Sequence, residues 1–439
     1  MRQAVRAPRS RRHLFAALVL AAIVGLLVTS CSDGHREVRS IPAAGWPQFG
    51  GTGGNTNWTP VTAAQNLKLT WSRHAGGAIT SALSVNAHGE VGVTTATSDG
   101  CNTFLFDSVS GRKQWCKKMA FATNGNTLAF DQNGQPFIGE AGVFLAFNGG
   151  GNIRWRAGTV GVPMSAKFAG PGQILTVTSQ GQVLLLNAQT GDSLAPEVRL
   201  RADAKPDDPR FGFADCATGG PLCGVSAPPA VDTSRARFFL NFTPVGTTGG
   251  RLSAMGYSAT DGERSVREQW TAEVGGGMMG APSLSVDGAT VYAFGRDGRL
   301  YAFNADDGAP RWNYDLGGVG FASLSVSPDG VLIPTGDLAS PLTVLRDTGS
   351  KAEQVAKNTD VKVVSLAAQT GTDTAWAVVR ASDAGSALSL VEVSTADGSV
   401  KRTLELPGAT GFTTGVVISS GGNVTTATNA GEVFYFSPN

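Results

Sequence analysis

Charged residues are scarce in this chain of 439 residues, in which Asp, Glu, Lys and Arg together make up 16%. The 35 basic and 34 acidic residues almost cancel, so the formal net charge is +1. Five arginines and no acidic residue lie in residues 1–30, which leaves the remainder slightly acidic. Because no basic stripe is present, nucleic acid is not an expected partner.

Histidine is also rare, and only His74 and His88 lie beyond residue 45. Nucleophilic catalysis needs a Ser or Cys beside a base and an orienting acid. Both histidines fall in the first part of a strand-rich region, and we expect them to be surface positions. A metal site would need clustered His or closely spaced Cys, which the sequence lacks. The sequence therefore predicts no catalytic residue, no metal site and no cofactor.

Glycine, by contrast, is abundant, with 58 residues, and it marks a repeated pattern. In residues 291–312 two alternating strands flank Asp297-Gly298, a dipeptide that tolerates the positive φ angles of a hairpin turn. A third strand begins after the next turn and contains Trp312. The same order of a glycine turn followed by tryptophan recurs at Trp115, Trp155 and Trp270.

The repeat predicts an all-β fold, an eight-bladed β-propeller in which each blade is a four-stranded antiparallel sheet. A period of roughly 40–45 residues with four short strands per unit is typical of propellers. Eight stretches rich in small residues read as inner strands, beginning at Gly76, Phe121, Val160, Cys223, Gly276, Gly317, Asp360 and Ala409. The chain ends three strands into the last unit, so residues 67–73 are expected to close the ring. Seven blades is the alternative, if residues 355–404 join a neighbouring unit.

The N-terminus has the features of an export signal. Residues 1–30 combine a basic start with an apolar run, which is typical of a secretory signal peptide. Residues 28–31 resemble a bacterial lipobox, so Cys31 is expected to carry lipid after cleavage; an uncleaved membrane anchor is the alternative. Residues 10–15 also resemble the twin-arginine export motif. Residues 31–45 are polar and are expected to form a flexible tether before a propeller spanning 46–439.

The other four cysteines are expected to form disulfides, because an even number in an exported protein favours pairing. Cys101 and Cys116 flank a hairpin almost symmetrically. Cys216 and Cys223 lie seven residues apart in an insertion, residues 201–229, that lengthens the fourth unit.

Two segments carry a family resemblance. Residues 46–71, WPQFGGTGGNTNWTPVTAAQNLKLTW, resemble the opening of propellers related to quinoprotein dehydrogenases. Residues 297–312, DGRLYAFNADDGAPRW, resemble the pyrroloquinoline quinone repeat of the same superfamily. These motifs serve hairpin turns and packing between blades, with each Trp expected to dock on the next blade, so they indicate fold better than chemistry.

Within the superfamily the overall pattern is similar to the BamB-like lipoproteins, which combine a signal, a lipobox cysteine and an eight-bladed propeller without cofactor. Quinone-dependent dehydrogenases carry adjacent cysteines under the quinone and acidic calcium ligands. Here no two cysteines are adjacent, and four candidate acids show no such arrangement, namely Glu140, Glu263, Glu268 and Glu273.

The resemblance implies an exported protein that is lipid-anchored, through a palmitate-bearing Cys31, to the outer face of a bacterial membrane. That membrane is the plasma membrane or the periplasmic face of the outer membrane. Its expected role is a non-catalytic scaffold that binds other cell-envelope proteins. A quinone-dependent oxidoreductase and a propeller that binds a small ligand or glycan are the alternatives.

Two regions are candidate partner-binding surfaces. Residues just before the inner strands are expected to line a mouth of the axial channel, unless they plug it; they are Met278, Met279, Phe321 and Phe412. The insertion could anchor a partner through Phe211 and Phe213, or these rings could pack onto the neighbouring blade. Met side chains adapt to varied partners, which favours a peptide or loop over a rigid cofactor.

Overall fold

The computed structural model describes residue 1 and residues 39–439, except 98, 121–124, 319–320, 337–339, 381–386, 439 and the side chains of 321 and 322. The chain divides into two compact units, Met1–Val38 and Arg39–Asn439. The expected signal peptide and Cys31 lie outside the described residues. Among the described residues, no helix has both the length and the apolar character needed to cross a bilayer.

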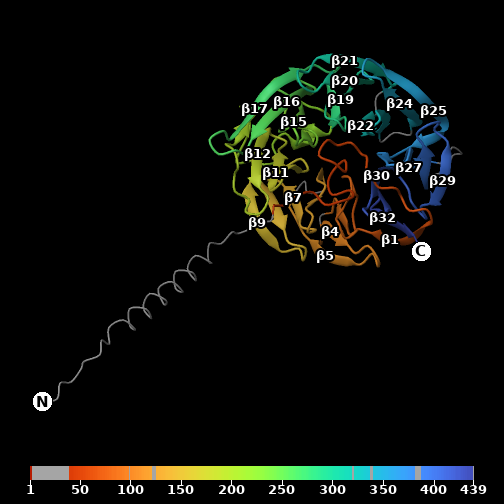
Figure 1. The fold of residues 1–439 in the computed structure, drawn as a ribbon, viewed down its shortest axis with the longest axis horizontal. Helices are drawn as coiled ribbons and strands as arrows, with labels where there is room; N and C mark the ends of the chain where they lie inside the picture. Colours follow the sequence, from red (N-terminus) through yellow and green to blue (C-terminus); the bar gives the residue numbers. More distant parts are fainter. Residues whose placement is uncertain are drawn as a thin grey trace. The chain divides into compact units, whose positions relative to one another are not determined.

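Residues 39–439 form antiparallel sheets arranged around a ring, which confirms the predicted all-β class (Figure 1). The first three sheets contain β2 (Ser84–Val85), β3 (Val91–Thr94), β4 (Thr103–Phe106) and β5 (Lys113–Lys117), then β6 (Ala129–Phe130), β7 (Pro136–Glu140), β8 (Val143–Phe147) and β9 (Ile153–Gly158), then β10 (Lys167–Gly170), β11 (Gln173–Val177), β12 (Gln182–Asn187) and β13 (Val198–Arg199). The next two contain β14 (Ala230–Asp232), β15 (Arg237–Phe242), β16 (Arg251–Ser258) and β17 (Ser265–Ala272), then β18 (Met278–Leu284), β19 (Thr290–Gly295), β20 (Arg299–Asn304) and β21 (Pro310–Asp315).

An eight-stranded sheet follows in the described part of the chain. It contains β22 (Phe321–Val326), β23 (Val331–Gly336), β24 (Ser340–Asp347), β25 (Ala352–Val363), β26 (Ala368–Gln369), β27 (Thr374–Arg380), β28 (Leu388–Ser394) and β29 (Val400–Glu405). Its two halves join only where the end of β25 pairs with β27, through Lys362 with Arg380 and Val363 with Val379. Each half therefore has its own set of four consecutive strands.

The last sheet closes the ring. It combines β30 (Thr413–Ile418), β31 (Val424–Thr428) and β32 (Glu432–Pro438) with β1 (Leu67–His74) from the other end of the ring. β1 pairs antiparallel with β32 from Leu67 opposite Pro438 to His74 opposite Glu432. This pairing confirms the prediction that residues 67–73 supply the missing outer strand. His74 is exposed on this strand, as expected.

Tryptophans on the outer strands join neighbouring sheets, as the repeat predicted. The indole Nε1 of Trp71 donates to the carbonyl of Ser108 at 3.0 Å, and Trp270 donates in the same way to Ala305 at 3.2 Å. Trp115 and Trp155 make equivalent bonds to Gly149 and Ala188. In each case the acceptor lies in the last turn of the following sheet, so every bond spans the gap between two sheets.

The eight stretches predicted to be inner strands all contain strands, namely β2, β6, β10, β14, β18, β22, β26 and β30. A segment ahead of them, residues 46–64, runs through the middle of the ring (Figure 1). We call this segment the strap. It touches each of these strands or the turn that follows.

The strap meets the sheets in chain order through its backbone. Its carbonyls accept backbone hydrogen bonds of 2.7–2.9 Å, from Val85 to Trp46, Phe130 to Pro47, Val231 to Gly53, Leu284 to Gly54, Val326 to Thr56 and Gln369 to Asn57. The third sheet contacts it through the Lys167 side chain, which donates to Thr52 O at 3.0 Å. The last sheet contacts the strap in the turn between β30 and β31, where Ala64 N donates to Gly422 O at 3.0 Å. The strap is therefore hydrogen-bonded to every sheet of the ring.

The described end of the predicted tether is also ordered. Ser40 is fully buried, and its Oγ donates to Asp131 Oδ2 at 2.9 Å. Ala43 N donates to Phe130 O at 3.0 Å, and Gly172 N donates to Ser40 O at 2.8 Å. Residues 39–45 thus pack on the second and third sheets instead of extending the tether to residue 45. Polar composition alone missed these contacts because they are made by the backbone and one short hydroxyl side chain.

Candidate functional site

A cavity of about 280 Å³ lies where residues from the inner strands converge. Its wall includes Ser81, Met164, Ala227, Ala281 and Phe412, each from a different part of the ring, together with Phe49 of the strap. Because successive sheets each contribute to the wall, the cavity lies on the axis of the ring. Small residues at these positions allow the strands to approach the axis closely.

Hydroxyl groups in the cavity wall tie neighbouring sheets together. Ser81 Oγ donates to Asn126 O at 3.0 Å, which connects the first sheet to the second. Thr127 Oγ1 returns a bond to Ala82 O at 2.9 Å, and Thr127 N donates to Ser165 Oγ at 2.9 Å in the third sheet. These hydroxyls are already engaged within the protein, so they offer little hydrogen-bonding capacity to a ligand.

Thr414 in β30 differs from these residues. It lines the cavity, is only 9% exposed, and its Oγ1 is buried without a hydrogen-bond partner. A buried hydroxyl without a partner is costly, because it has lost its bonds to water. Thr414 therefore provides a polar group that the surrounding protein does not satisfy.

The described residues that line the cavity include no charged side chain. A lysine lies behind the wall instead. Lys167 in β10 is fully buried, and its Nζ donates to the carbonyls of Phe49 and Thr52 and lies 5.4 Å from the centre of the Phe49 ring. Burial lowers the pKa of the Lys167 ammonium well below its ordinary value. Its donors are committed to the strap, so Lys167 holds the strap in place.

The four residues predicted to line the mouth of the channel lie in different environments. Phe412 is half-buried and lines the cavity, as expected. The prediction is wrong for Met278, which is 1% exposed and packs in the core between the fourth and fifth sheets. Met279 is half-buried and packs against the core of the next interface. The backbone of Phe321 pairs with that of Gly336, which lines the cavity. The side chain of Phe321 lies outside the described part of the structure.

The backbone of β18 explains why the methionines miss the cavity. The pairing of β18 with β19 is irregular between Met279 and Ser283, and Gly280 has a φ of 62°. Such a bulge changes which side chains face a given direction. The cavity is lined by Gly280 and Ala281, while Met278 turns into the core.

The insertion is braced at both ends. Cys216 and Cys223 form a disulfide within the insertion, as predicted. The other predicted disulfide, between Cys101 and Cys116, also forms, but it lies in the first sheet and not in the insertion. At the root of the insertion, Arg201 is buried and pairs with Asp203 at 2.5 Å, and the hydrogen bond from Arg201 lowers the pKa of that carboxyl group.

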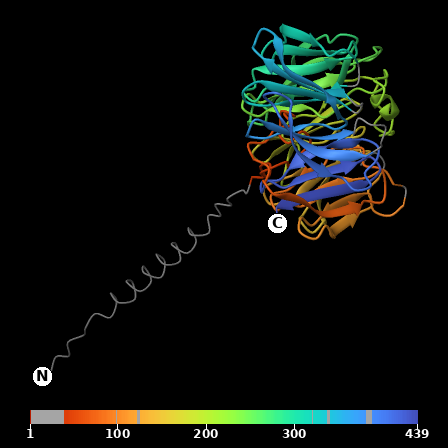
Figure 2. The same cartoon turned by 90° about the vertical axis from the view of Figure 1, so that its right-hand side faces the viewer.

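Further along, the insertion is fastened to the third sheet by Gln180. Gln180 Nε2 donates to Asp208 O at 2.7 Å, and its Oε1 accepts from Lys205 N at 2.6 Å. The short helix η2 (Phe213–Cys216) follows and lies at one face of the ring, in green at the right of Figure 2. Phe211 and Phe213 are both half-buried, and Phe213 packs against the core between the third and fourth sheets. For Phe213 the structure thus shows the packing that was the alternative to partner binding.

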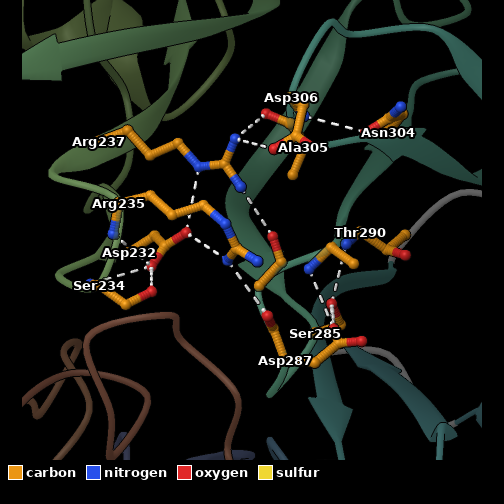
Figure 3. Close-up of polar contacts among 12 residues, drawn as sticks. Asp232, Ser234, Arg235, Arg237, Ser285, Asp287, Thr290, Asn304, Ala305 and Asp306 are labelled. Carbon is orange, nitrogen blue, oxygen red and sulfur yellow. Dashed lines mark hydrogen bonds and ion pairs between the residues drawn. The ribbon is translucent and has the colours of Figure 1, made fainter.

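An ionic cluster built on the buried Arg237 and Asp232 links the fourth and fifth sheets (Figure 3). Arg237 in β15 lies 3.1 Å from Asp232 and 2.6 Å from Asp306, and its Nη2 donates to Gly288 O at 2.9 Å. Arg235 approaches the same Asp232 oxygen at 3.1 Å from the exposed side. Both guanidinium groups thus have a carboxylate partner, and the cluster holds the fourth and fifth sheets together.

The titration of Asp232 fits this structural role. Burial raises the pKa of the carboxyl group, but hydrogen bonds from Ser234 and Arg235 and the charge of Arg237 outweigh it, so the pKa is lowered overall. An ionised, fully partnered carboxylate is a poor general acid. Among the described residues, no group of three or more His, Cys, Asp or Glu is arranged to hold a metal ion.

Sequence reasoning missed the strap and Lys167. The strap's bonds join residues more than 30 positions apart, so no local pattern reveals them. A signal for Lys167 was present: residues 160–169, VGVPMSAKFA, contain one charged residue among small and apolar ones. A lysine in such a strand is rarely buried unless its head group is paired.

Comparison with known proteins provides a family match and a curated relative. The model of the family described as outer membrane protein assembly factor BamB matches residues 140–437. Protein Rv3035 of Mycobacterium tuberculosis is 32% identical over 412 residues, which covers 93% of this chain and 99% of that protein.

Three solved structures show the same fold at low identity. The quinohemoprotein alcohol dehydrogenase of Comamonas testosteroni has a TM-score of 0.59 and 12% identity, covering 92% of this chain and 81% of that one. BamB of Moraxella catarrhalis has a TM-score of 0.52 and 14% identity, covering 84% and 99%. A europium-containing methanol dehydrogenase has a TM-score of 0.60 and 12% identity, covering 90% and 98%. The sheets thus match propellers of the quinoprotein type.

Proposed function

The chain belongs to the BamB family of pyrroloquinoline-quinone-type repeat propellers, and on this basis we propose that it is a lipid-anchored, eight-bladed scaffold of the cell envelope. In this proposal it binds other envelope proteins and catalyses no reaction. The family shares a fold that hosts both binding proteins and enzymes, so the site and not the fold determines the role.

The proposed count of eight blades is supported by the arrangement of the eight-stranded sheet. Its halves, β22–β25 and β26–β29, each contain four consecutive strands and join through two residue pairs only. Counted separately, they give eight blades with the other sheets. The strap supports this count, because it contacts the sixth inner strand through Thr56 and the seventh through Asn57.

The lipid anchor rests on Cys31. The other four cysteines are paired in disulfides, which persist in oxidising compartments outside the cytosol. Lipidation would give the protein an attachment to the membrane surface through its acyl chains. Replacing Cys31 with Ser is expected to move the protein from the membrane fraction to the soluble fraction. Persistent membrane association of a signal-cleaved Cys31→Ser protein would contradict the anchor.

The observation that carries the scaffold proposal is the braced insertion together with the turn between β15 and β16, which each hold an apolar side chain at the surface. Leu222 is 41% exposed and Val245, in the turn between β15 and β16, is 51% exposed. The two segments are tied together, because Thr243 N donates to Gly224 O at 2.8 Å. A rigid apolar surface binds a partner at a smaller entropic cost than a mobile one.

The quinone-dependent alternative does not fit the described cavity wall. That wall provides no acidic side chain to hold a cation and no adjacent cysteines, and the cysteines of the propeller are used in two disulfides. The likeness to dehydrogenases is one of fold at 12% identity. We therefore derive no redox step for this protein.

Site-specific photo-crosslinking in cells tests the scaffold role. A crosslinking residue at Val245 should capture envelope proteins, and Leu222→Asp should reduce their yield because it places a charge in the apolar surface. Val109, which is 79% exposed in the turn between β4 and β5, is the matched control. The same products from both positions, or none from Val245, would show that the binding surface lies elsewhere.

A further inference from the structure

We propose that the axial cavity binds a neutral, largely apolar ring compound about the size of two fused aromatic rings. The cavity measures about 280 Å³. A dry apolar cavity of roughly 150 Å³ accommodates benzene, so this one has room for about two rings. This inference is independent of the scaffold role, because the exposed insertion and the cavity are different surfaces.

The cavity offers aromatic and soft side chains to such a ligand. Phe49 and Phe412 contribute rings, while Met164 and Leu366 contribute flexible or branched apolar groups. Aromatic rings pack favourably against other rings, and a thioether makes favourable contacts with a ring. Phe49 is held in place because its carbonyl accepts from Lys167, so this part of the wall is preformed.

The absence of charge from the described wall selects a neutral ligand. Moving a charged group out of water without an ionic partner costs far more than moving a neutral one. The ammonium group of Lys167 is not available as a partner, because it donates to the carbonyls of Phe49 and Thr52 behind the wall.

The wall also limits the number of polar groups on the ligand. Ser81, Thr127 and Ser165 are engaged in bonds between sheets, Ser323 Oγ accepts from Asn57 Nδ2, and Thr413 Oγ1 donates to Val364 O. Thr414 Oγ1 lacks a partner in the fold, and a rotation of the side chain turns it toward one polar atom of a ligand in the cavity. A saccharide carries more hydroxyl groups than the few remaining wall hydroxyls can bond, and each unbonded one would lose a water without gaining a bond, so the wall favours a ring with few polar groups.

Isothermal titration calorimetry of the mature protein at pH 7 tests these points with three probes. We expect 2-naphthol, which is neutral at this pH, to bind at one site. We expect 2-naphthalenesulfonate, which has the same rings with a charge, to bind at least about tenfold more weakly. Maltose is expected to give no binding heat. No binding of 2-naphthol, equal binding of the sulfonate, or tighter binding of maltose would each overturn the proposal.

Two substitutions in the cavity wall and one control locate the site. Ala281→Phe fills part of the cavity and should abolish 2-naphthol binding, whereas Ala396→Phe, in an exposed turn, should leave it unchanged. Thr414→Val keeps the volume and removes the hydroxyl group, so it should weaken 2-naphthol binding by about fivefold.

Thr414→Val also has a readout that does not depend on the ligand. Because Thr414 Oγ1 has no partner in the fold, its removal should not lower the melting temperature of the free protein. This variant keeps the proposal testable if Ala281→Phe does not fold. Undiminished 2-naphthol binding in a folded Ala281→Phe or Thr414→Val protein would place the ligand outside the cavity.

Discussion

Single residues show most directly how the repeat holds the sheets together. Each docked tryptophan ring lies on a glycine of the next sheet's turn. A Cβ added to Gly308 would lie 2.5 Å from Trp270, and one added to Gly111 would lie 2.5 Å from Trp71. Both glycines have positive φ angles, at 74° and 63°. Each of these positions therefore requires glycine for two reasons: the positive φ of the backbone and the space that the indole ring occupies.

Gly308→Ala is expected to destabilise the protein by roughly 2–3 kcal/mol, since it combines backbone strain with overpacking. Gly349→Ala is the matched control, because Gly349 has a φ of 88° but no atom within 4 Å of an added Cβ. The control should cost only about 1 kcal/mol. Urea denaturation measures both, and equal losses would mean that Trp270 relaxes freely.

Lys167 is the second residue whose chemistry has a measurable consequence. Burial lowers its pKa in the folded state, while in the unfolded chain a lysine has a pKa of about 10.4. Between these two values the unfolded state binds more protons, so the free energy of unfolding rises with pH. This contribution is fully present above the unfolded pKa and declines as the pH falls toward the folded one.

Replacing Lys167 with Met removes this titration, so the stability difference between wild type and Lys167→Met should grow in favour of wild type from pH 7 to pH 10. Chemical denaturation at each pH measures the difference. Lys401→Met, at an exposed position, serves as the control and should give a constant difference. A flat difference for Lys167→Met would show that Lys167 keeps an ordinary pKa in the fold.

At the scale of elements, the strap is the segment on which the sheets converge. Asn55 is 1% exposed with a φ of 55°, and its Nδ2 donates to Pro229 O at 3.1 Å and Pro282 O at 2.9 Å. These bonds join the strap to the fourth and fifth sheets. Asn tolerates a positive φ better than most residues, which suits it to this position.

Two substitutions at Asn55 separate its backbone and side-chain roles. Asn55→Gly keeps the backbone conformation but leaves two carbonyls without a donor, which should cost about 1–3 kcal/mol. Asn55→Ala should cost about 1 kcal/mol more because of its positive φ. Melting temperatures should therefore fall in the order wild type, Asn55→Gly, Asn55→Ala. A Gly variant as stable as wild type would mean that the amide bonds contribute nothing.

The elements that sequence predicted well are those with local causes. Asp297-Gly298 determines a hairpin through its own backbone preferences, and Trp312 repeats at the spacing of the sheets. Phe412 was placed correctly at the cavity. Met278 was not, because a bulge further along β18 decides which side chains face the axis. The strap escaped prediction because its partners are distant in sequence and are reached through backbone carbonyls.

On the scale of the propeller, the N-terminal part of the ring makes two different kinds of closure. The strap contacts every sheet from the centre, and β1 then completes the last sheet at the rim. Both closures depend on residues 46–74. A propeller without such pairing would leave an open strand edge, which is prone to pair with other chains.

The seam between β1 and β32 is non-covalent, and this makes it the expected place where unfolding begins. The seam is held by strand hydrogen bonds and by the Trp71 ring, which stacks on Tyr435 with centroids 5.0 Å apart. The strands on either side of the seam come from opposite ends of the ring. Their separation therefore frees a long stretch of chain, which gains conformational entropy.

A disulfide across the seam tests this expectation. Lys68 lies opposite Ser437 in the register, and Lys68 is exposed, so a Lys68→Cys, Ser437→Cys pair can form without repacking the core. Linking residues so far apart should raise the melting temperature by several degrees, because the crosslink restricts the unfolded chain. The Lys68→Cys single variant is the control, and reductant should remove the gain relative to wild type treated alike. If the oxidised pair melts at the wild-type temperature, unfolding starts elsewhere in the ring, and the strap becomes the closure that limits its stability.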